Sequence, residues 1–277
     1  MTTTILLVGH GSRNQNGNDE IRKFREQWQA QHSDWRIELC YIELADVLLD
    51  EGLSRAAQHS KRVVIVPLIL SAAGHVKMEI PEHIEHARKR FPDVEFIYAP
   101  HIGVNEDVLK ILKKDLKNAL KSLAMPDPKT TGVIILGRGS SDRVANGELA
   151  KLARWLYEDS EHELVDIAFT GITHPRLETA VRRQVSLGMM QIVVLPYYLF
   201  TGLLIERIGV QMQRLKMQYP NIAFACGHYF GFDPAIFKLL DQRVMQAIDP
   251  VSPVQLECDG CQYREQVEHQ HEHHHHQ

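Results

Sequence analysis

Residues 5–16, ILLVGHGSRNQN, are an apolar run that ends in a glycine-flanked histidine, and residues 133–146, VIILGRGSSDRVAN, repeat this pattern with arginine in its place. A strand-length apolar run, a glycine turn and a polar helix-forming stretch are typical of a βαβ unit. The copies lie about 128 residues apart. The chain is therefore predicted to contain two copies of one α/β unit, which differ where His10 is exchanged for Arg138.

The repeat extends through both halves of the chain. At the same offset, four residues fall on identical ones: Gly9, Gly11, Ser12 and Gly74 on Gly137, Gly139, Ser140 and Gly202. Within each half, apolar runs alternate with longer amphipathic stretches. This alternation predicts an α/β protein of two similar lobes, each a mostly parallel, doubly wound sheet with helices on both faces.

The predicted elements follow from these runs. Strands are expected near 4–9, 36–42, 62–68 and 94–98, and in the second half near 132–137, 163–169, 191–196 and 222–226. Helices are expected near 17–31, 51–59, 78–90 and 105–122, with Pro81 at an early position of the third. The predicted domains are an N-terminal lobe over 1–123 with the metal and catalytic site, a linker over 124–131, a degenerate second lobe over 132–248 and a flexible Cys- and His-rich tail over 249–277.

Composition excludes several function classes. The 277 residues carry a net charge of −4 with His neutral, which argues against a general nucleic-acid binder. The first apolar run is too short to span a membrane and lacks the flanks of a signal peptide, so a cytoplasmic protein without membrane contact is expected. Cys40 and Cys226 fall in predicted strands, where a buried thiol acts as a small hydrophobe.

Three polar side chains follow the first three strands of the first half. They are His10, Glu43 in CYIELAD and His75 in LSAAGHVKMEIP. Ligands of parallel α/β folds bind beyond the carboxyl ends of strands, so these side chains are expected to share one cleft. Imidazole and carboxylate suit cobalt, iron, nickel or zinc, and the same groups also accept protons near neutral pH.

The second half provides an internal comparison for this trio. Its counterparts are Arg138, Gly171 and Leu203, so all three candidate ligands are absent together. A lone histidine is more often structural, and a glutamate at a strand end often faces solvent. Joint loss is better explained by a trio that works as a unit, and Arg138 then serves a different purpose in the same turn.

Four segments resemble the long, two-repeat sirohydrochlorin chelatases called CbiX: GHGSRNQNGN, YIELAD, PLILSAAGHVKMEIP and LGRGSSDRVAN. The resemblance spans essentially the whole chain. It implies the class II chelatase fold, two lobes facing a cleft, and ATP-independent insertion of Co²⁺ or Fe²⁺ into sirohydrochlorin in cobalamin or siroheme biosynthesis. In that family the residues matching His10 and His75 handle the metal, with the equivalent of Glu43 nearby.

Sirohydrochlorin is rich in carboxylates, which need cationic partners. Candidates at strand ends and first helical turns are Arg13, Lys77, Arg138, Arg143 and Arg207, although each could equally be a solvated surface charge. In the second half, PYYLFTGLLIER adds Tyr197, Tyr198 and Phe200, which could line a tetrapyrrole pocket or pack in the core.

The tail contains CDGC and a dense run of histidines. Cys258 and Cys261 have the C-x-x-C spacing of metal and redox sites, but a closed site needs further ligands. The resemblance implies an iron–sulfur centre there. The main alternative to a chelatase is a metal or tetrapyrrole carrier that uses this tail, and the sequence leaves open the choice among cobalt, iron and nickel and whether the protein is a monomer or a weak dimer.

Overall fold

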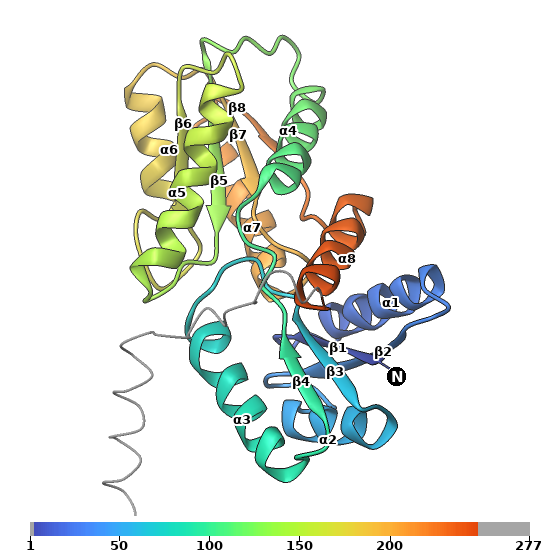
Figure 1. Ribbon diagram of the computed structural model, residues 1–277. Helices are drawn as coiled ribbons and strands as arrows, with labels where there is room; N and C mark the ends of the chain where they lie inside the picture. The colour runs from blue at the N-terminus through green and yellow to red at the C-terminus, as the bar shows by residue number, and fades with distance from the viewer. Residues whose placement is uncertain (1–2, 249–277) are drawn as a thin grey trace, which may run out of the picture. The chain divides into compact units, whose positions relative to one another are not determined.

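The computed structural model describes residues 3–248 (Figure 1). Strands and helices alternate along the first half: β1 (Thr3–Gly9), α1 (Gln15–Gln31), β2 (Arg36–Tyr41), α2 (Leu49–His59), β3 (Arg62–Pro67), a π-helical turn η1 (His75–Glu79), α3 (Ile80–Arg90), β4 (Glu95–Tyr98) and α4 (Glu106–Leu120). The second half continues with β5 (Thr131–Gly137), α5 (Arg143–Glu158), β6 (Val165–Phe169), α6 (Leu177–Ser186), β7 (Gln191–Pro196), α7 (Leu203–Gln218), β8 (Ala223–Cys226) and α8 (Pro234–Ile248).

The chain divides into two compact units. The first comprises the described parts of Met1–Arg13, Arg25–Ile102 and Leu240–Gln277, and the second comprises Asn14–Phe24 and Gly103–Leu239. Helices α1 and α8 each begin in the second unit and end in the first. The linker expected at 124–131 stays a prediction.

The first unit holds a parallel sheet of order β2-β1-β3-β4. Its central strands are apolar on both faces, as a covered sheet requires, and Leu6 and Ile65 are fully buried. One face packs against α2 and α3, where Leu53 and Ile84 join the same core cluster. The carboxyl ends of β2, β1 and β3 are therefore neighbours at one edge of a well-packed sheet.

The second unit holds a parallel sheet of the same topology, β6-β5-β7-β8. Helices α6 and α7 share one face of it, through residues such as Val181 and Met212. Helices α4 and α5 contact each other and the strands. The predicted fold class, two similar α/β lobes with helices around each parallel sheet, is confirmed.

The third helix differs from its prediction. It was expected to begin near residue 78, but the helical path begins at His75 with a π turn, in which the Ile80 amide donates to the His75 carbonyl. Pro81 has no N–H to donate to the carbonyl four residues earlier. The α-helical series of backbone hydrogen bonds is therefore interrupted at Pro81, and the wider π turn is tolerated before it. This turn places His75 and Glu79 on one helical segment.

One cysteine prediction is wrong. Cys40 is buried as expected, but Cys226, the last residue of β8, is exposed. No helix in the described range 3–248 is long and apolar enough to cross a membrane.

Candidate metal site

The three predicted ligands come together in the first unit. His10 follows β1, Glu43 follows β2, and His75 opens η1 after β3. These strands are parallel neighbours in the order β2-β1-β3, so their carboxyl ends lie along one edge of the sheet. The loops that leave this edge bring side chains together that are more than thirty residues apart in sequence.

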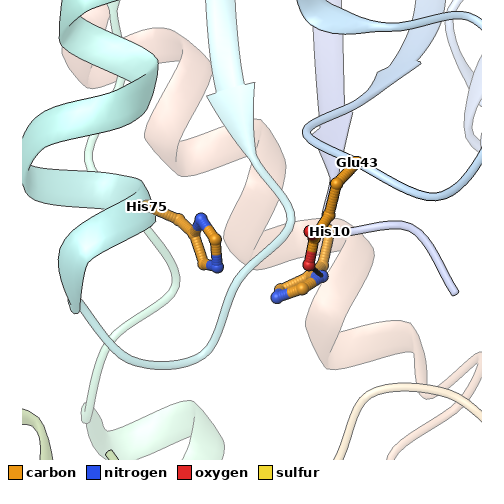
Figure 2. Close-up of side chains that lie close together, drawn as sticks. All are labelled: His10, Glu43 and His75. Atoms are coloured by element: carbon orange, nitrogen blue, oxygen red, sulfur yellow. Dashed lines mark ion pairs between the residues drawn. The ribbon is translucent and has the colours of Figure 1, made fainter. Parts of the chain in front are cut away.

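The ligand atoms of His10, Glu43 and His75 all lie within 4.8 Å of one another. The two imidazole rings meet edge to face with centroids 4.6 Å apart, and His10 Nδ1 lies 3.6 Å from Glu43 Oε1 (Figure 2). Ligand atoms of one tetrahedral ion lie about 3.4 Å apart, since each stands about 2.1 Å from the metal. The separations of up to 4.8 Å therefore have to shrink by at most about 1.4 Å, which rotation of the part-exposed side chains can supply.

Such a site is open. The side chains of His10 and Glu43 keep 27% and 45% of their surface exposed. Three protein ligands leave coordination positions for water or substrate, which is the pattern of catalytic rather than structural metal sites. Within residues 3–248, no other group of His, Cys, Asp or Glu is close enough to form a comparable cluster.

A glycine turn fixes where Glu43 stands. Gly11 has φ +88°, and a Cβ built on it would lie 1.7 Å from the backbone oxygen of Glu43. The Glu43 amide donates to the His10 carbonyl at 3.1 Å. Only glycine allows the two loops to approach this closely, which is the physical reason for the second glycine of the GHG pattern.

Glu79 is a site residue that the sequence prediction missed. Its Oε2 lies 2.5 Å from His75 Nδ1. A carboxylate on Nδ1 holds the proton there and leaves the Nε2 lone pair for a metal, as carboxylates do when they accept the free ring N–H of a metal-bound histidine. The i, i+4 spacing of His75 and Glu79 was the available signal, but it counts only if both residues lie on one helix, and the predicted helix began after His75.

The second unit keeps the same loops but not the ligands. The Gly171 amide donates to the Arg138 carbonyl at 3.0 Å, and Gly139 has φ +87° with its Cβ position 2.3 Å from the Gly171 oxygen. These contacts reproduce those of Gly11 and Glu43. The second half therefore keeps the backbone arrangement of the first and differs from it in the side chains. Leu203, at the start of α7, stands in place of His75.

The predicted cationic residues occupy both units. Arg13 is exposed in the turn after β1, and Lys77 is half-buried in η1; both belong to the first unit. The remaining three are exposed in the second unit, after β5 and in the first two turns of α5 and α7: Arg138, Arg143 and Arg207.

The aromatic residues of the second half divide between core and strand end. Tyr197 is buried with its ring 5.5 Å from that of Phe230, and the ring of Phe200 lies 5.4 Å from that of Phe24, so both pack within the second unit. Tyr198 shares a 2.6 Å hydrogen bond with Thr170. Burial raises the pKa of Tyr198 to about 12, against the effects of that hydrogen bond and of the Arg138 charge.

The predicted tail ligands, Cys258 and Cys261, lie outside the described residues, as do the tail histidines.

Comparisons with known proteins agree with this description. The CbiX family model matches twice, over residues 4–119 and 132–247. The chain is 38% identical to sirohydrochlorin cobaltochelatase from Priestia megaterium, over 94% of this chain and 84% of that one. It also resembles the structure of SirB from Bacillus subtilis with Fe³⁺ (29% identity, TM-score 0.78) and that of the sirohydrochlorin chelatase SirB from Bacillus subtilis subspecies spizizenii in complex with cobalt (28%, 0.74); each match covers 93% of this chain and 100% of that one. The chain belongs to the CbiX family of class II sirohydrochlorin chelatases, in the long form with two repeats.

Proposed function

We propose that this protein inserts Co²⁺ or Fe²⁺ into sirohydrochlorin without ATP, and that His10, Glu43 and His75 carry the reaction. The observation that carries the proposal is the trio itself: its ligand atoms lie within 4.8 Å of one another in the first half, while the same backbone in the second half bears none of them. The P. megaterium relative is named a cobaltochelatase, and the SirB structures hold iron and cobalt.

The metal is a substrate, so its site has to release it. Neutral imidazole and carboxylate bind first-row divalent ions well, and more ligands would hold the ion too firmly for transfer. A half-exposed three-ligand site accepts the ion from solvent and keeps positions free for incoming pyrrole nitrogens. Glu79 orients His75 throughout by its contact with Nδ1.

Insertion exchanges one divalent ion for two pyrrole protons. The ion loses water and ligand atoms as it bonds to the ring nitrogens, and two N–H bonds of the ring break. Imidazole accepts protons near neutral pH, and Glu43, 3.6 Å from His10, can receive them and release them to solvent. Holding the ring in a puckered geometry aims its nitrogen lone pairs at the ion and favours the transition state over the ground state.

The carboxylates of the ring are assigned to the cationic side chains. Arginine binds carboxylates in bidentate fashion, which suits the five predicted residues: Arg13, Lys77, Arg138, Arg143 and Arg207. In this assignment, residues 1–123 supply the metal site, 124–131 link the lobes, and 132–248 contribute substrate contacts. A monomer or weak dimer suffices, since one chain carries both lobes.

The test is anaerobic mixing of purified protein with sirohydrochlorin and Co²⁺, Fe²⁺ or Ni²⁺ side by side, followed by visible absorption. Acceleration by the wild-type protein, lost in His10→Ala and His75→Ala, is expected. Unimpaired turnover in both variants would contradict the site assignment. The comparison of ions also ranks the three metals as substrates of the purified protein.

The tail separates the enzyme from the carrier alternative. Deleting residues 250–277 should leave insertion at saturating metal largely intact in an enzyme, whereas a carrier would lose its metal capacity. An iron–sulfur centre at Cys258 and Cys261 stays a prediction, and it is tested by iron and sulfide analysis of anaerobically purified protein.

A further inference from the structure

Two exposed apolar residues are held in an unfavourable backbone conformation. Leu44 has φ +62° and Ile172 has φ +61°, the left-handed region that normally takes glycine, asparagine or aspartate. For a β-branched residue such as Ile172 this is a true outlier. The two residues keep 47% and 60% of their surface exposed, so burial in the fold does not offset the strain.

The two residues occupy the same position of the repeat. Leu44 directly follows Glu43, and Ile172 directly follows Gly171, the counterpart of Glu43. Strain that occurs once can be incidental to a loop. Its recurrence at one position in both halves, with a large apolar side chain each time, indicates that the side chain itself is required.

The loops that carry these residues are pinned at both ends. In the first half, the Glu43 amide donates to the His10 carbonyl, and the Tyr41 amide donates to the Val47 carbonyl at 2.8 Å. Such flanking bonds are what hold a residue in a sparsely populated conformation. Leu44 is therefore fixed beside the metal site rather than free to relax.

The second loop is pinned in the same way. The Gly171 amide donates to the Arg138 carbonyl, and the Phe169 amide donates to the Pro175 carbonyl at 2.9 Å. The Thr173 amide donates back to the Gly171 carbonyl at 2.6 Å, which closes a tight three-residue turn around Ile172. The side chain is again fixed outward at the end of the strand.

Other apolar residues in the segments that follow the strands are also exposed. Met78 in η1 keeps 43% exposure and Leu48, at the end of the first loop, keeps 47%; Leu203, the counterpart of His75, keeps 45%. Exposed positions that follow strands usually carry polar residues. A ligand with an extended apolar face would suit the apolar residues found here.

We propose that Leu44 and Ile172 are rigid apolar contacts for the face of the macrocycle, kept in place by backbone strain. This rests on the proposed function, since it takes the substrate to be a tetrapyrrole. Leu44 lies next to Glu43 in the chain, so it binds the ring close to the ion, whereas the carboxylates of the ring are left to the cationic side chains. Preorganised side chains bind without losing rotational freedom on contact.

The test replaces each residue with one that prefers the same backbone. Asparagine tolerates left-handed φ but removes the apolar side chain. Leu44→Asn and Ile172→Asn should each weaken sirohydrochlorin binding to metal-free protein about fivefold, the value of the half of a large apolar side chain that is still exposed. The melting temperature should stay level or rise, because strain is relieved.

Two further variants sharpen the result. Leu44→Met keeps an apolar side chain and should bind the ring within about twofold of wild type. Leu187, 66% exposed at ordinary φ −88°, provides the matched control, and Leu187→Asn should leave ring binding unchanged. Co²⁺ binding at the site is measured without the ring, as the Co²⁺ signal of each protein minus that of His10→Ala. It should be unaffected in every variant.

Unchanged ring affinity in both asparagine variants would overturn the proposal. A loss of ring affinity accompanied by weaker Co²⁺ binding or a lower melting temperature would overturn it as well. Ring affinity is measured without metal, so the outcome is separate from turnover. Wild-type protein that binds the ring but inserts no metal would refute the proposed function and leave the role of Leu44 and Ile172 standing. Wild-type protein that does not bind the ring would refute both.

Discussion

Alanine at position 11 should destroy the metal site without touching a ligand. Gly11 sits at φ +88°, and its Cβ would meet the backbone oxygen of Glu43 at 1.7 Å. Cβ atoms essentially never approach other atoms within 3.0 Å, so the two loops must separate by more than about 1 Å. The obstacle is backbone, so rotation of a side chain cannot relieve it.

Two costs follow for Gly11→Ala. A left-handed backbone costs about 1–2 kcal/mol for a residue with a Cβ, and the displaced loop adds to it, so unfolding free energy should fall by about 2–4 kcal/mol. The clash displaces the backbone that carries Glu43, so the side-chain rotation that closes the trio on an ion no longer brings all three ligands together. Co²⁺ affinity at the site should therefore fall by at least about tenfold.

The repeat supplies matched controls. Gly139 has φ +87° and a Cβ position 2.3 Å from the Gly171 oxygen, so Gly139→Ala should lose similar stability but keep Co²⁺ binding. Gly147 lies in α5 with nothing within 4 Å of its Cβ position, so Gly147→Ala should gain up to about 1 kcal/mol.

Stability is measured by urea unfolding, and site binding by Co²⁺ ligand-field absorption after subtraction of the His10→Ala signal, which removes the contribution of tail histidines. Gly11→Ala protein that binds Co²⁺ like wild type would refute the inference that this turn positions Glu43. Equal loss of Co²⁺ binding in Gly139→Ala would show a general effect on folding instead.

Three further predictions test the division of roles and one buried charge. His10→Arg should end metal insertion with the melting temperature kept, whereas Arg138→His should mainly raise KM for sirohydrochlorin; loss of kcat in the second variant contradicts this. Glu79→Gln should weaken Co²⁺ binding about 10–100-fold with helical circular dichroism unchanged, and wild-type affinity would remove Glu79 from the site. Burial raises the pKa of Asp115 above its ordinary 3.8, so the folded state holds this proton more tightly and stability falls as pH rises above 3.8; Asp115→Asn should remove that loss, and identical pH–stability curves would be evidence against it.

Much of the architecture was determined by local sequence. Apolar runs of strand length, separated by amphipathic stretches, predicted both parallel sheets because burial on both faces leaves few other arrangements. The rule that ligands bind beyond the carboxyl ends of parallel strands predicts from the sequence alone that His10, Glu43 and His75 lie at one edge of the sheet. Glycine at positions 11 and 139 marked the turns because only glycine fits there.

Tertiary structure decided the details that set the chemistry. The partner of His75 depended on a π turn upstream of Pro81, and the strained placement of Leu44 and Ile172 depended on loops pinned to the neighbouring strand. The exposure of Cys226 depended on where β8 ends. Periodicity reports which side of an element is buried, whereas the contacts between loops depend on the path of the backbone between distant residues, which no local pattern encodes.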